Sequence, residues 1–526
     1  MAFWCCRVPA VSFARPTHST ILKMHCVPLM RHAAQQSSSC RYVPWINRVS
    51  RMNDQFESRL FLKNGWQTSK STFDVLNKFS GDSIATVFEA DQEQVAAAIA
   101  HCRDAFGKGV PNPYERSEIL RRAADILSDE RALFEATYEA ETGFTKSDAR
   151  AEVSRCIETF RLSGEEARRF DANETIPMSG APGSARRFGY LRRMPIGPVA
   201  AITPFNSPLN TVAHKVAPAI AAGNPIILKP SSQTPLCGAL IISLLLKAGW
   251  PGDLCALLQG TRNVGRALLS NPDIAFFTFT GSTEVGRDVH AAAGLRKTQL
   301  ELGSIAFTIV AADANLDDAI AKICSGAFRK AGQVCTSVQT VLADKSILAE
   351  MTERLAEATG NAVYGDPSAE GVLTGPMISL AAAEKAQQRI DNAVRQGAQV
   401  VRGGKRDRSV LQPTLLVGAD PTADVRCREM FAPVVSVAPF NTLDEAISIV
   451  NATPYGLASG LFTTRIDAAF KAAERLDVGN VHINNTSSAR VDLMPYGGVK
   501  DSGLGREGPA YAMREMTHEK LVTFEL

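Results

Sequence analysis

Residues 198–230 read PVAAITPFNSPLNTVAHKVAPAIAAGNPIILKP, and this stretch carries the clearest signal of fold class in the chain. Two short apolar runs, PVAAITPF and NPIILKP, enclose a segment with the composition of a helix that extends through Ala222. Strands of a parallel sheet are covered on both faces, so they read as continuous apolar runs. The same alternation continues to residue 312, with a helix through Gly249, then CALLQG, IAFFTFTG and another helix. The pattern predicts a doubly wound α/β domain.

The composition is that of an ordinary globular protein with more than one core. The chain has 526 residues, so two or three domains are expected. Hydrophobic residues make up 45% and charged residues 21%, and the net charge of +3 does not point to a nucleic-acid partner. The longest apolar run, 236–246, ends at Lys247 and is too short for a membrane span. Cysteines without CxxC pairs or histidines at zinc spacing favour reduced thiols over disulfides or a structural metal.

Residues 1–51 differ from the rest in composition. They are rich in Arg and Ser, and no acid appears before Asp54, which is typical of a mitochondrial transit segment. The alternative, which we favour, is that the functional chain starts at Met52, because residues 1–51 show little amphipathic periodicity. The first interpretation predicts a mitochondrial matrix protein and the second a cytoplasmic one. In both, the segment is expected to be disordered or foreign to the functional chain and to carry no chemistry.

Helices and a hairpin surround the alternating region. Asp91 followed by Gln94 resembles a capping box and predicts a helix after it, and apolar spacing predicts two more over 119–140 and 149–170. Residues 177–195 (PMSGAPGSARRFGYLRRMP) predict an extended hairpin, and the final KLVTFEL predicts a strand.

The candidate nucleophile is Cys335, in the segment FRKAGQVCTS from Phe328 to Ser337. It follows a helix-like run and precedes a β-branched one, where a loop can expose its sulfur. A thiolate attacks carbonyl carbon well, and small changes in its surroundings activate it. A buried structural thiol is the alternative interpretation of this segment alone.

A lone acid upstream supplies a second candidate. Glu301 lies between two leucines in TQLELGS (Thr298–Ser304), just before the apolar run IAFTIV. A buried carboxylate is costly unless it is paired or useful. Cys335 and Glu301 together predict a thioester formed on the cysteine and hydrolysed by water that the carboxylate deprotonates.

The motifs LELGS and GQVCTS resemble those of the aldehyde dehydrogenase superfamily, and the match runs from about Leu60 to the C-terminus. Residues 493–508 (LMPYGGVKDSGLGREG) are similar to the succinate-semialdehyde, lactaldehyde and phosphonoacetaldehyde dehydrogenase branches. The resemblance implies a doubly wound cofactor-binding domain, a second α/β catalytic domain and a small β oligomerisation hairpin. The expected boundaries are 52–176 with 196–303 for the first, 304–505 for the second, and 177–195 with 506–526 for the oligomerisation segments.

The resemblance also implies a site for NAD or NADP. FTGSTEVG, residues 279–286, follows an apolar strand and opens a helix whose N-terminus suits a pyrophosphate. By the family's GSTxxG element, Gly281, Ser282 and Gly286 lie beside the pyrophosphate and nicotinamide. Lys229 is implied to bind the adenosine ribose or its phosphate. Ser232 stands where NAD-preferring members often carry glutamate, so NADP is expected to be accepted.

Three further residues are carried over from family motifs. REMFAPV resembles ExFxPV, which implies that Glu429 holds the nicotinamide ribose and that Phe431 packs near the nicotinamide. ITPFNSPL resembles xPxNxP, which implies that the Asn206 amide and the backbone N–H of Cys335 stabilise the oxyanion. The alternative is that Asn206 only stabilises the backbone geometry of a turn.

Four residues are candidates for the substrate pocket. Arg329 stands where succinate-semialdehyde dehydrogenases carry an arginine for the substrate carboxylate, and a guanidinium fork suits a planar anion. The second arginine of those enzymes is replaced by His214, for which Arg155 is a candidate substitute, and Arg490 is expected near the mouth. A small anionic aldehyde is favoured over a small neutral, hydroxylated or aromatic one.

Other functions stay open at this point. Transfer of the acyl group to coenzyme A and a catalytically silent binding or structural relative are both alternatives to hydrolysis. A thiolase or cysteine hydrolase would explain Cys335 but neither the GSTEVG turn nor Lys229. The family assembles as dimers or tetramers, and no nucleic-acid or membrane partner is expected.

Overall fold

The computed structural model describes residues 56–170, 174–184 and 186–525, all within the unit formed by residues 48–526. The predictions for residues 1–51 lie outside the described residues. Within the part described, no helix has the length and apolarity needed to cross a membrane.

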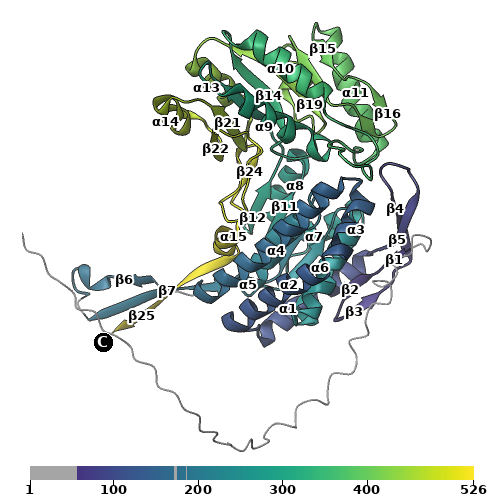
Figure 1. Ribbon diagram of the computed structural model, residues 1–526. Helices are drawn as coiled ribbons and strands as arrows, with labels where there is room; N and C mark the ends of the chain where they lie inside the picture. The colour runs from purple at the N-terminus through teal and green to yellow at the C-terminus, as the bar shows by residue number, and fades with distance from the viewer. Residues whose placement is uncertain (1–55, 171–173, 185, 526) are drawn as a thin grey trace, which may run out of the picture. The chain divides into compact units, whose positions relative to one another are not determined.

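An eight-stranded sheet carries the predicted alternation, in the order β24-β12-β11-β8-β9-β10-β2-β3 (Figure 1). Its central strands run parallel; they are β8 (Val199–Ile202), β9 (Ile226–Lys229), β10 (Cys255–Leu257), β11 (Phe276–Thr280) and β12 (Lys297–Glu301). Antiparallel strands extend both edges; they are β2 (Leu60–Leu62) and β3 (Gly65–Gln67) on one side and β24 (Gly503–Leu504) on the other.

Helices connect the parallel strands and cover both faces of the sheet. They are α5 (Asn210–Ala221), α6 (Pro235–Lys247), α7 (Arg262–Ser270) and α8 (Thr283–Ala293). The chain passes from β8 outward through β9 and β10, then returns to β11 and β12 on the other side of β8. Because crossovers between parallel strands are right-handed, this reversal places α7 and α8 on the face opposite α5 and α6. The doubly wound fold is confirmed, and its order reverses between β8 and β11, where such sheets bind ligands at the strands' carboxyl ends.

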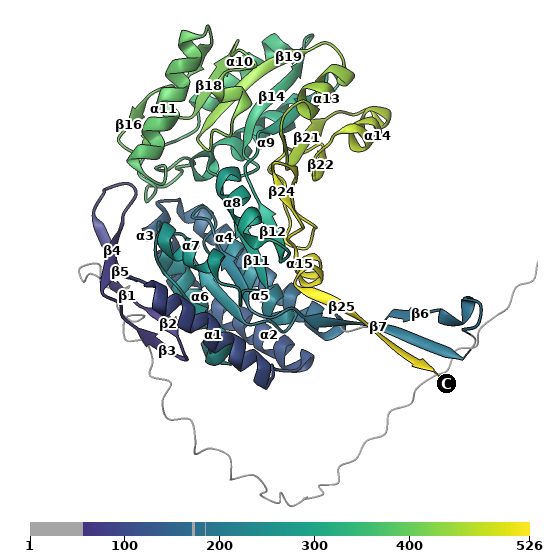
Figure 2. The ribbon, with the colours of Figure 1, turned by 180° about the vertical axis from the view of Figure 1, so that it is seen from behind.

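A second sheet of seven strands follows, in the order β15-β18-β19-β14-β13-β21-β22 (Figure 2). The strands are β13 (Ala306–Val310), β14 (Val338–Asp344), β15 (Gln399–Arg402), β18 (Thr414–Val417), β19 (Val434–Phe440), β21 (Ala458–Phe462) and β22 (Asn480–Ile483). All pairings are parallel except that of the edge strand β15. The accompanying helices are α9 (Leu316–Phe328), α10 (Leu348–Gly360), α11 (Leu380–Arg395), α12 (Asp424–Cys427), α13 (Leu443–Asn451) and α14 (Ile466–Arg475). This is the predicted second α/β unit.

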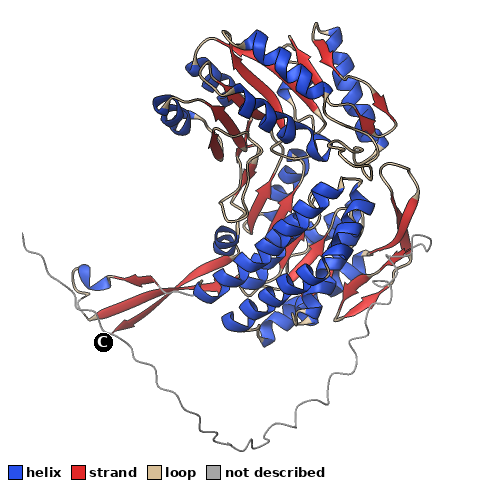
Figure 3. Ribbon diagram, viewed as in Figure 1, coloured by secondary structure: helices blue, strands red, loops and turns tan. Residues whose placement is uncertain are grey.

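The N-terminal helices, labelled in Figure 1 and drawn in blue with the other helices in Figure 3, agree with the sequence except at one junction. They are α1 (Gln92–Lys108), α2 (Pro113–Asp129), α3 (Arg131–Thr142) and α4 (Lys146–Arg169). The predicted capping box is present on α1, where the Asp91 side chain accepts from Gln94 N and the Gln94 side chain from Asp91 N. The single helix predicted over 119–140 is wrong, because α2 ends and α3 begins at Glu130. Apolar spacing continues through the junction, so it does not reveal the change of direction.

A separate three-stranded sheet joins distant segments of the chain, and its strands pair with none of those in the two larger sheets. Its strands are β6 (Glu174–Ile176), β7 (Arg187–Pro195) and β25 (Thr517–Glu525), in the order β25-β7-β6. β25 pairs antiparallel along the whole of β7, from Glu525 opposite Arg187 to Thr517 opposite Pro195. The predicted hairpin and terminal strand are therefore neighbours in one small sheet.

Candidate active site

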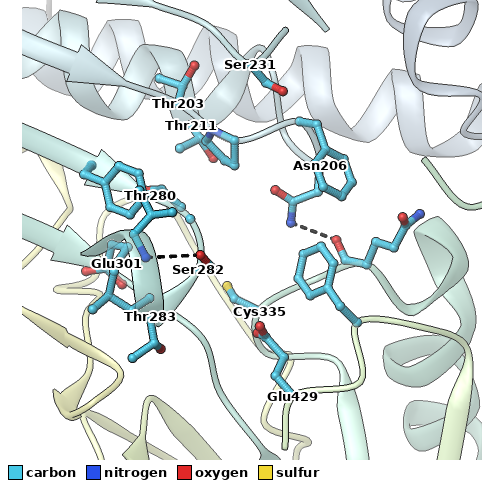
Figure 4. A pocket seen from close by; sticks show the side chains of 18 of the residues that line it. Thr203, Asn206, Thr211, Ser231, Thr280, Ser282, Thr283, Glu301, Cys335 and Glu429 are labelled. Carbon is cyan, nitrogen blue, oxygen red and sulfur yellow. Dashed lines mark hydrogen bonds between the residues drawn. The ribbon is translucent and has the colours of Figure 1, made fainter. Parts of the chain in front are cut away.

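A cavity of about 1360 Å³ opens at the carboxyl ends of the parallel strands (Figure 4). Ile202, Lys229, Thr280 and Glu301, which end β8, β9, β11 and β12, all line it. The opposing wall comes from the loops before β14 and β19 of the second sheet. The fold thus brings together segments that the sequence places up to several hundred residues apart.

The loop that carries Cys335 follows α9 through a run of left-handed backbone. Lys330, Ala331 and Gly332 have φ values of 52°, 51° and 65°. Only glycine adopts this region without cost, and a Cβ on Gly332 would lie 2.2 Å from the carbonyl oxygen of Ala432. The run ends α9 sharply and turns the following residues, Cys335 among them, onto the cavity wall.

The sulfur of Cys335 lies 2.8 Å from the phenol oxygen of Tyr496. Burial raises the pKa of the Cys335 thiol to about 11, against the Tyr496 hydrogen bond and the charge on Arg490, which lower it. The carboxyl groups of Glu301 and Glu429 add a smaller upward effect. The environment therefore keeps the free thiol protonated at neutral pH, and Tyr496 and Arg490 oppose that tendency.

Asn206 follows β8 and points toward the cysteine loop. Its side-chain nitrogen donates to the backbone carbonyl of Gln333 at 2.8 Å, drawn as a dashed line in Figure 4. Gln333 is itself held, since its side chain donates to the carbonyl of Lys330 and accepts from the N–H of Ile378. An amide has two N–H bonds, so one remains for a ligand in the cavity that Asn206 lines.

Glu301 ends β12 with a buried carboxylate, neither oxygen of which has a hydrogen-bond partner among the described residues. Burial and the neighbouring charge of Glu507 raise its pKa well above the ordinary value, and Lys215 and Arg490 lower it less. Burial also opposes ionisation of Glu507, but the Lys215 ammonium, 2.9 Å away, and Arg490 lower the pKa of Glu507 to about 2. Of the two acids, Glu507 is therefore ionised at neutral pH, and Glu301, whose pKa is raised, is the one suited to accept and release a proton.

The α8 end of the cavity has the features of an anion site. Ser282 caps the helix, its hydroxyl accepting from Val285 N at 3.4 Å, and both Gly281 and Ser282 line the cavity. Gly286 lies one turn later, where a Cβ would lie 2.2 Å from the Leu302 side chain. Its role here is close packing of α8 on the β12 loop, and it does not line the cavity.

Lys229, at the end of β9, and Ser232, three residues later, also line the cavity. The only hydrogen bond of the Lys229 ammonium among the described residues is a long one of 3.4 Å to the carbonyl of Pro230. Burial lowers the pKa of Lys229 to about 8, and Glu89 raises it slightly. A buried ammonium with so weak a partner is a ready ligand for a polar group.

Glu429 and Phe431, from the loop before β19, also line the cavity. One Glu429 oxygen accepts from Ser304 N at 3.1 Å, and burial raises its pKa to about 7. Phe431, at φ 51°, packs edge-to-face on Phe205, with ring centroids 5.7 Å apart.

Three of the four predicted substrate residues line the cavity, and one does not. Arg155, Arg329 and Arg490 do. His214 is buried on α5 and lies 2.9 Å from a carboxylate oxygen of Asp492, so its prediction as a pocket residue is wrong. Every residue of α5 is buried, and His214 faces the Asp492 carboxylate rather than the cavity.

Several residues of the site were not singled out from the sequence. Tyr496 is part of the quoted LMPYGG stretch, but nothing local marks its contact with the cysteine. Lys215 is a lone charge in the apolar helix TVAHKVAPAIA, which is a usable signal for a buried ion pair. Arg262 and Arg266 lie one helical turn apart at the start of α7 and line the cavity beside Lys229.

Comparisons with known proteins agree with this arrangement. The sequence matches the aldehyde dehydrogenase family over residues 66–522. A 3-sulfolactaldehyde dehydrogenase of Priestia aryabhattai is 42% identical over 468 residues, 89% of this chain and 98% of that protein. The crystal structure of aldehyde dehydrogenase 21 from Physcomitrella patens in complex with the reaction product succinate is 34% identical, has a TM-score of 0.87 and covers 90% of this chain and 99% of that one.

A third similar protein carries a cofactor. The crystal structure of glyceraldehyde-3-phosphate dehydrogenase GapN from Methanocaldococcus jannaschii, complexed with NADP, is 36% identical and has a TM-score of 0.83. It covers 87% of this chain and 100% of that one. With the family match extending over most of the sequence, this chain belongs to the aldehyde dehydrogenase family and is an NAD(P)-dependent oxidoreductase that acts on aldehydes.

Proposed function

We propose that the protein oxidises a short semialdehyde or hydroxyaldehyde with an anionic group to the carboxylic acid, through a thioester on Cys335. The observation that carries the proposal is that Cys335, Asn206 and Glu301 line one cavity, which Arg155, Arg329 and Arg490 also line. Loss of any of the three would have favoured a silent relative instead.

The part of the cavity beside the N-terminus of α8 and Lys229 suits a nicotinamide dinucleotide. The capped N-terminus of α8 offers N–H groups to a pyrophosphate, and the weakly partnered Lys229 ammonium suits a ribose hydroxyl or phosphate. Glu429 supplies a carboxylate acceptor for a second ribose. Bound there, NAD(P)⁺ supplies the hydride acceptor for the oxidation.

The chain's own residues account for the remaining chemistry. The Cys335 thiolate attacks the aldehyde carbon, forming a C–S bond and placing negative charge on the former carbonyl oxygen. The free N–H of Asn206 and the backbone N–H of Cys335 donate to that oxygen. Once the carbon has lost its hydride, it is the acyl carbon of a thioester. Glu301 then accepts a proton from water as the water oxygen attacks this carbon. Breakage of the C–S bond releases the acid and the Cys335 thiolate, and Glu301 afterwards gives up the proton to solvent.

The arginines favour an anionic substrate. Arg329 donates to the Ser488 hydroxyl at 2.8 Å and has no ion pair among the described residues. Arg490 pairs with Glu507 at 3.0 Å, but its buried Nε has no hydrogen-bond partner among the described residues. Arg155 is already neutralised by Asp492. Arg329 and Arg490 therefore have donors left for a carboxylate or sulfonate, and sulfolactaldehyde and the succinate product named for the two similar proteins are both anions.

The test is the initial rate of NAD⁺ or NADP⁺ reduction with sulfolactaldehyde, succinate semialdehyde, lactaldehyde and propanal. We expect an anionic aldehyde to have the highest kcat/KM, and Cys335→Ala to abolish activity while Cys324→Ala, a thiol outside the cavity, retains it. Addition of coenzyme A should not yield a thioester product. Full activity of Cys335→Ala would refute the mechanism, and a thioester product would establish the acylating alternative.

The part of the cavity beside Lys229 also favours NADP over NAD. Ser232 places no carboxylate near Lys229, and Arg262 and Arg266 line the same wall without an ion pair to any described residue. Uncompensated guanidinium groups stabilise a 2′-phosphate, which a carboxylate at position 232 would repel.

The small sheet of β6, β7 and β25 is a proposed self-association element. Phe188, Leu521 and Phe524 are exposed on it, and the rings of Phe188 and Phe524 lie 6.1 Å apart. Exposed aromatic side chains on paired strands suit contact with a second copy, so light scattering should report a dimer or tetramer that Phe188→Ser with Phe524→Ser weakens. A monomeric wild-type protein would contradict the proposal.

A further inference from the structure

Tyr496 is the one described side chain that hydrogen-bonds the sulfur of Cys335. The two residues are 161 positions apart in the sequence, and their Oη–Sγ distance is 2.8 Å. Tyr496 is 3% exposed, so solvent does not compete for the phenol. A contact of this length places the buried Tyr496 hydroxyl where it can influence the reactivity of the candidate nucleophile.

The backbone of Tyr496 is fixed by a bridge to Glu507. Tyr496 N donates to Glu507 O at 3.1 Å, and Glu507 N donates to Tyr496 O at 2.7 Å. The ring is fixed as well, because the guanidinium carbon of Arg490 lies 3.8 Å from the ring centroid and Arg490 Nη2 donates to Glu507 Oε2 at 3.0 Å. Tyr496 is thus held at both its main chain and its ring face, and its hydroxyl cannot easily leave the sulfur.

The proton between the two groups belongs to the phenol when the sulfur is ionised. Burial and the neighbouring Cys335 raise the pKa of Tyr496 well above the ordinary value, and Arg490 only partly offsets them. The phenol therefore keeps its proton and is a donor to a thiolate. Hydrogen bonds to ionised acceptors are about twice as strong as neutral ones, so this bond favours the thiolate over the thiol.

We propose that Tyr496 is a further catalytic residue, whose phenol donates a hydrogen bond to the Cys335 thiolate and holds it ready for attack, while Arg490 positions the ring. The thiol loses its proton to solvent and the phenol retains its own. As the sulfur forms its bond to the aldehyde carbon it loses its charge, and the hydrogen bond weakens. The proposal rests on the function proposed above, with Cys335 as the nucleophile.

The test measures the thiolate directly, with the full-length enzyme and without aldehyde. The rate of iodoacetamide alkylation at Cys335, followed by peptide mass spectrometry, is recorded against pH for the wild type and for Tyr496→Phe. Removing a hydrogen bond to a charged group should raise the apparent thiol pKa by about one unit, so alkylation below the midpoint slows roughly tenfold. Tyr138→Phe is the matched control, because Tyr138 is equally buried and its hydroxyl has no partner among the described residues.

A second variant gives the opposite sign and preserves the ring. Tyr496→3,5-difluorotyrosine carries a more acidic phenol, a stronger donor, and should lower the apparent thiol pKa. Unchanged alkylation profiles for both variants would overturn the proposal, and so would shifts of the same size in Tyr138→Phe. If Cys335→Ala is inactive while these profiles do not move, only the role of Tyr496 fails. If Cys335→Ala is active, the proposed function fails.

Discussion

A buried ion pair joins the cysteine loop to the asparagine loop, and breaking it should impair both stability and catalysis. Lys330 Nζ lies 2.9 Å from Glu152 Oε2 and donates to the carbonyl of Asn206 at 3.0 Å. The other Glu152 oxygen accepts from the Ser207 hydroxyl at 2.6 Å and from Asn210 N at 2.9 Å. One pair of side chains therefore anchors both the left-handed run before Cys335 and the turn after β8.

Replacing Lys330 by Met keeps the aliphatic stem and removes the charge. The Lys330 and Glu152 side chains are 8% and 1% exposed, so the carboxylate would remain buried without its cation. Loss of one partner of a buried pair costs about 3–5 kcal/mol. Because Asn206 loses an anchor, we also expect kcat to fall by about tenfold to a hundredfold, somewhat less than complete removal of an oxyanion donor.

The loss should depend on pH in a defined direction. Burial opposes ionisation of Glu152, but Lys330 and the hydrogen bonds outweigh it and hold its pKa below the ordinary 4.5. This pair therefore stabilises the protein above pH 4.5 and its contribution is lost as the pH falls through the lowered folded value. Without Lys330, burial raises the pKa of Glu152, so Lys330→Met should be most destabilised near pH 8 and less so near pH 5.5.

Thermal and urea unfolding of Lys330→Met, Glu152→Gln and the double variant form a cycle that isolates the pair. We expect the double variant to be more stable than the sum of the single losses predicts, because it leaves no unpaired charge. Single variants within about 1 kcal/mol of the wild type, or losses that simply add, would refute the reasoning, since they would show that the pair behaves like an exposed one.

Three further outcomes test the site. Glu301→Gln should keep a burst of nicotinamide reduction but slow steady-state turnover by about 10²–10⁴-fold. The variant should also lose the rise in rate with pH that the raised pKa of Glu301 predicts for the wild type. An unchanged steady-state rate would exclude Glu301 as the base. Arg262→Ala with Arg266→Ala should raise KM for NADP⁺ roughly tenfold and leave KM for NAD⁺ within about twofold, and equal effects on both cofactors would contradict a 2′-phosphate contact. Arg329→Ala should lower kcat/KM for an anionic aldehyde at least about tenfold more than for propanal, and a uniform loss would point to a structural role.

Local order was predictable because its causes are local. Continuous apolar runs identified the parallel strands, and the pairing of Asp91 with Gln94 identified the start of α1. Cys335 and Glu301 could be nominated because a thiol or an acid in apolar surroundings needs a reason. The resemblance of short motifs to a known family extended the list to Asn206 and the cofactor residues, whose roles stay predictions.

Which of these side chains meet depends on how distant segments pack in the folded chain. His214 was expected at the pocket but faces Asp492, and the segment predicted as one helix over 119–140 is two helices that meet at Glu130, because neither packing direction is encoded in apolar spacing. The contact of Tyr496 with Cys335 spans 161 residues and exists only because the segment after β22 returns to the first sheet through β24. The layers of the fold and the candidate reactive groups could be predicted from local sequence patterns. Charge, burial and hydrogen bonding at the site depend on residues brought together from distant segments, and only the folded chain sets those distances.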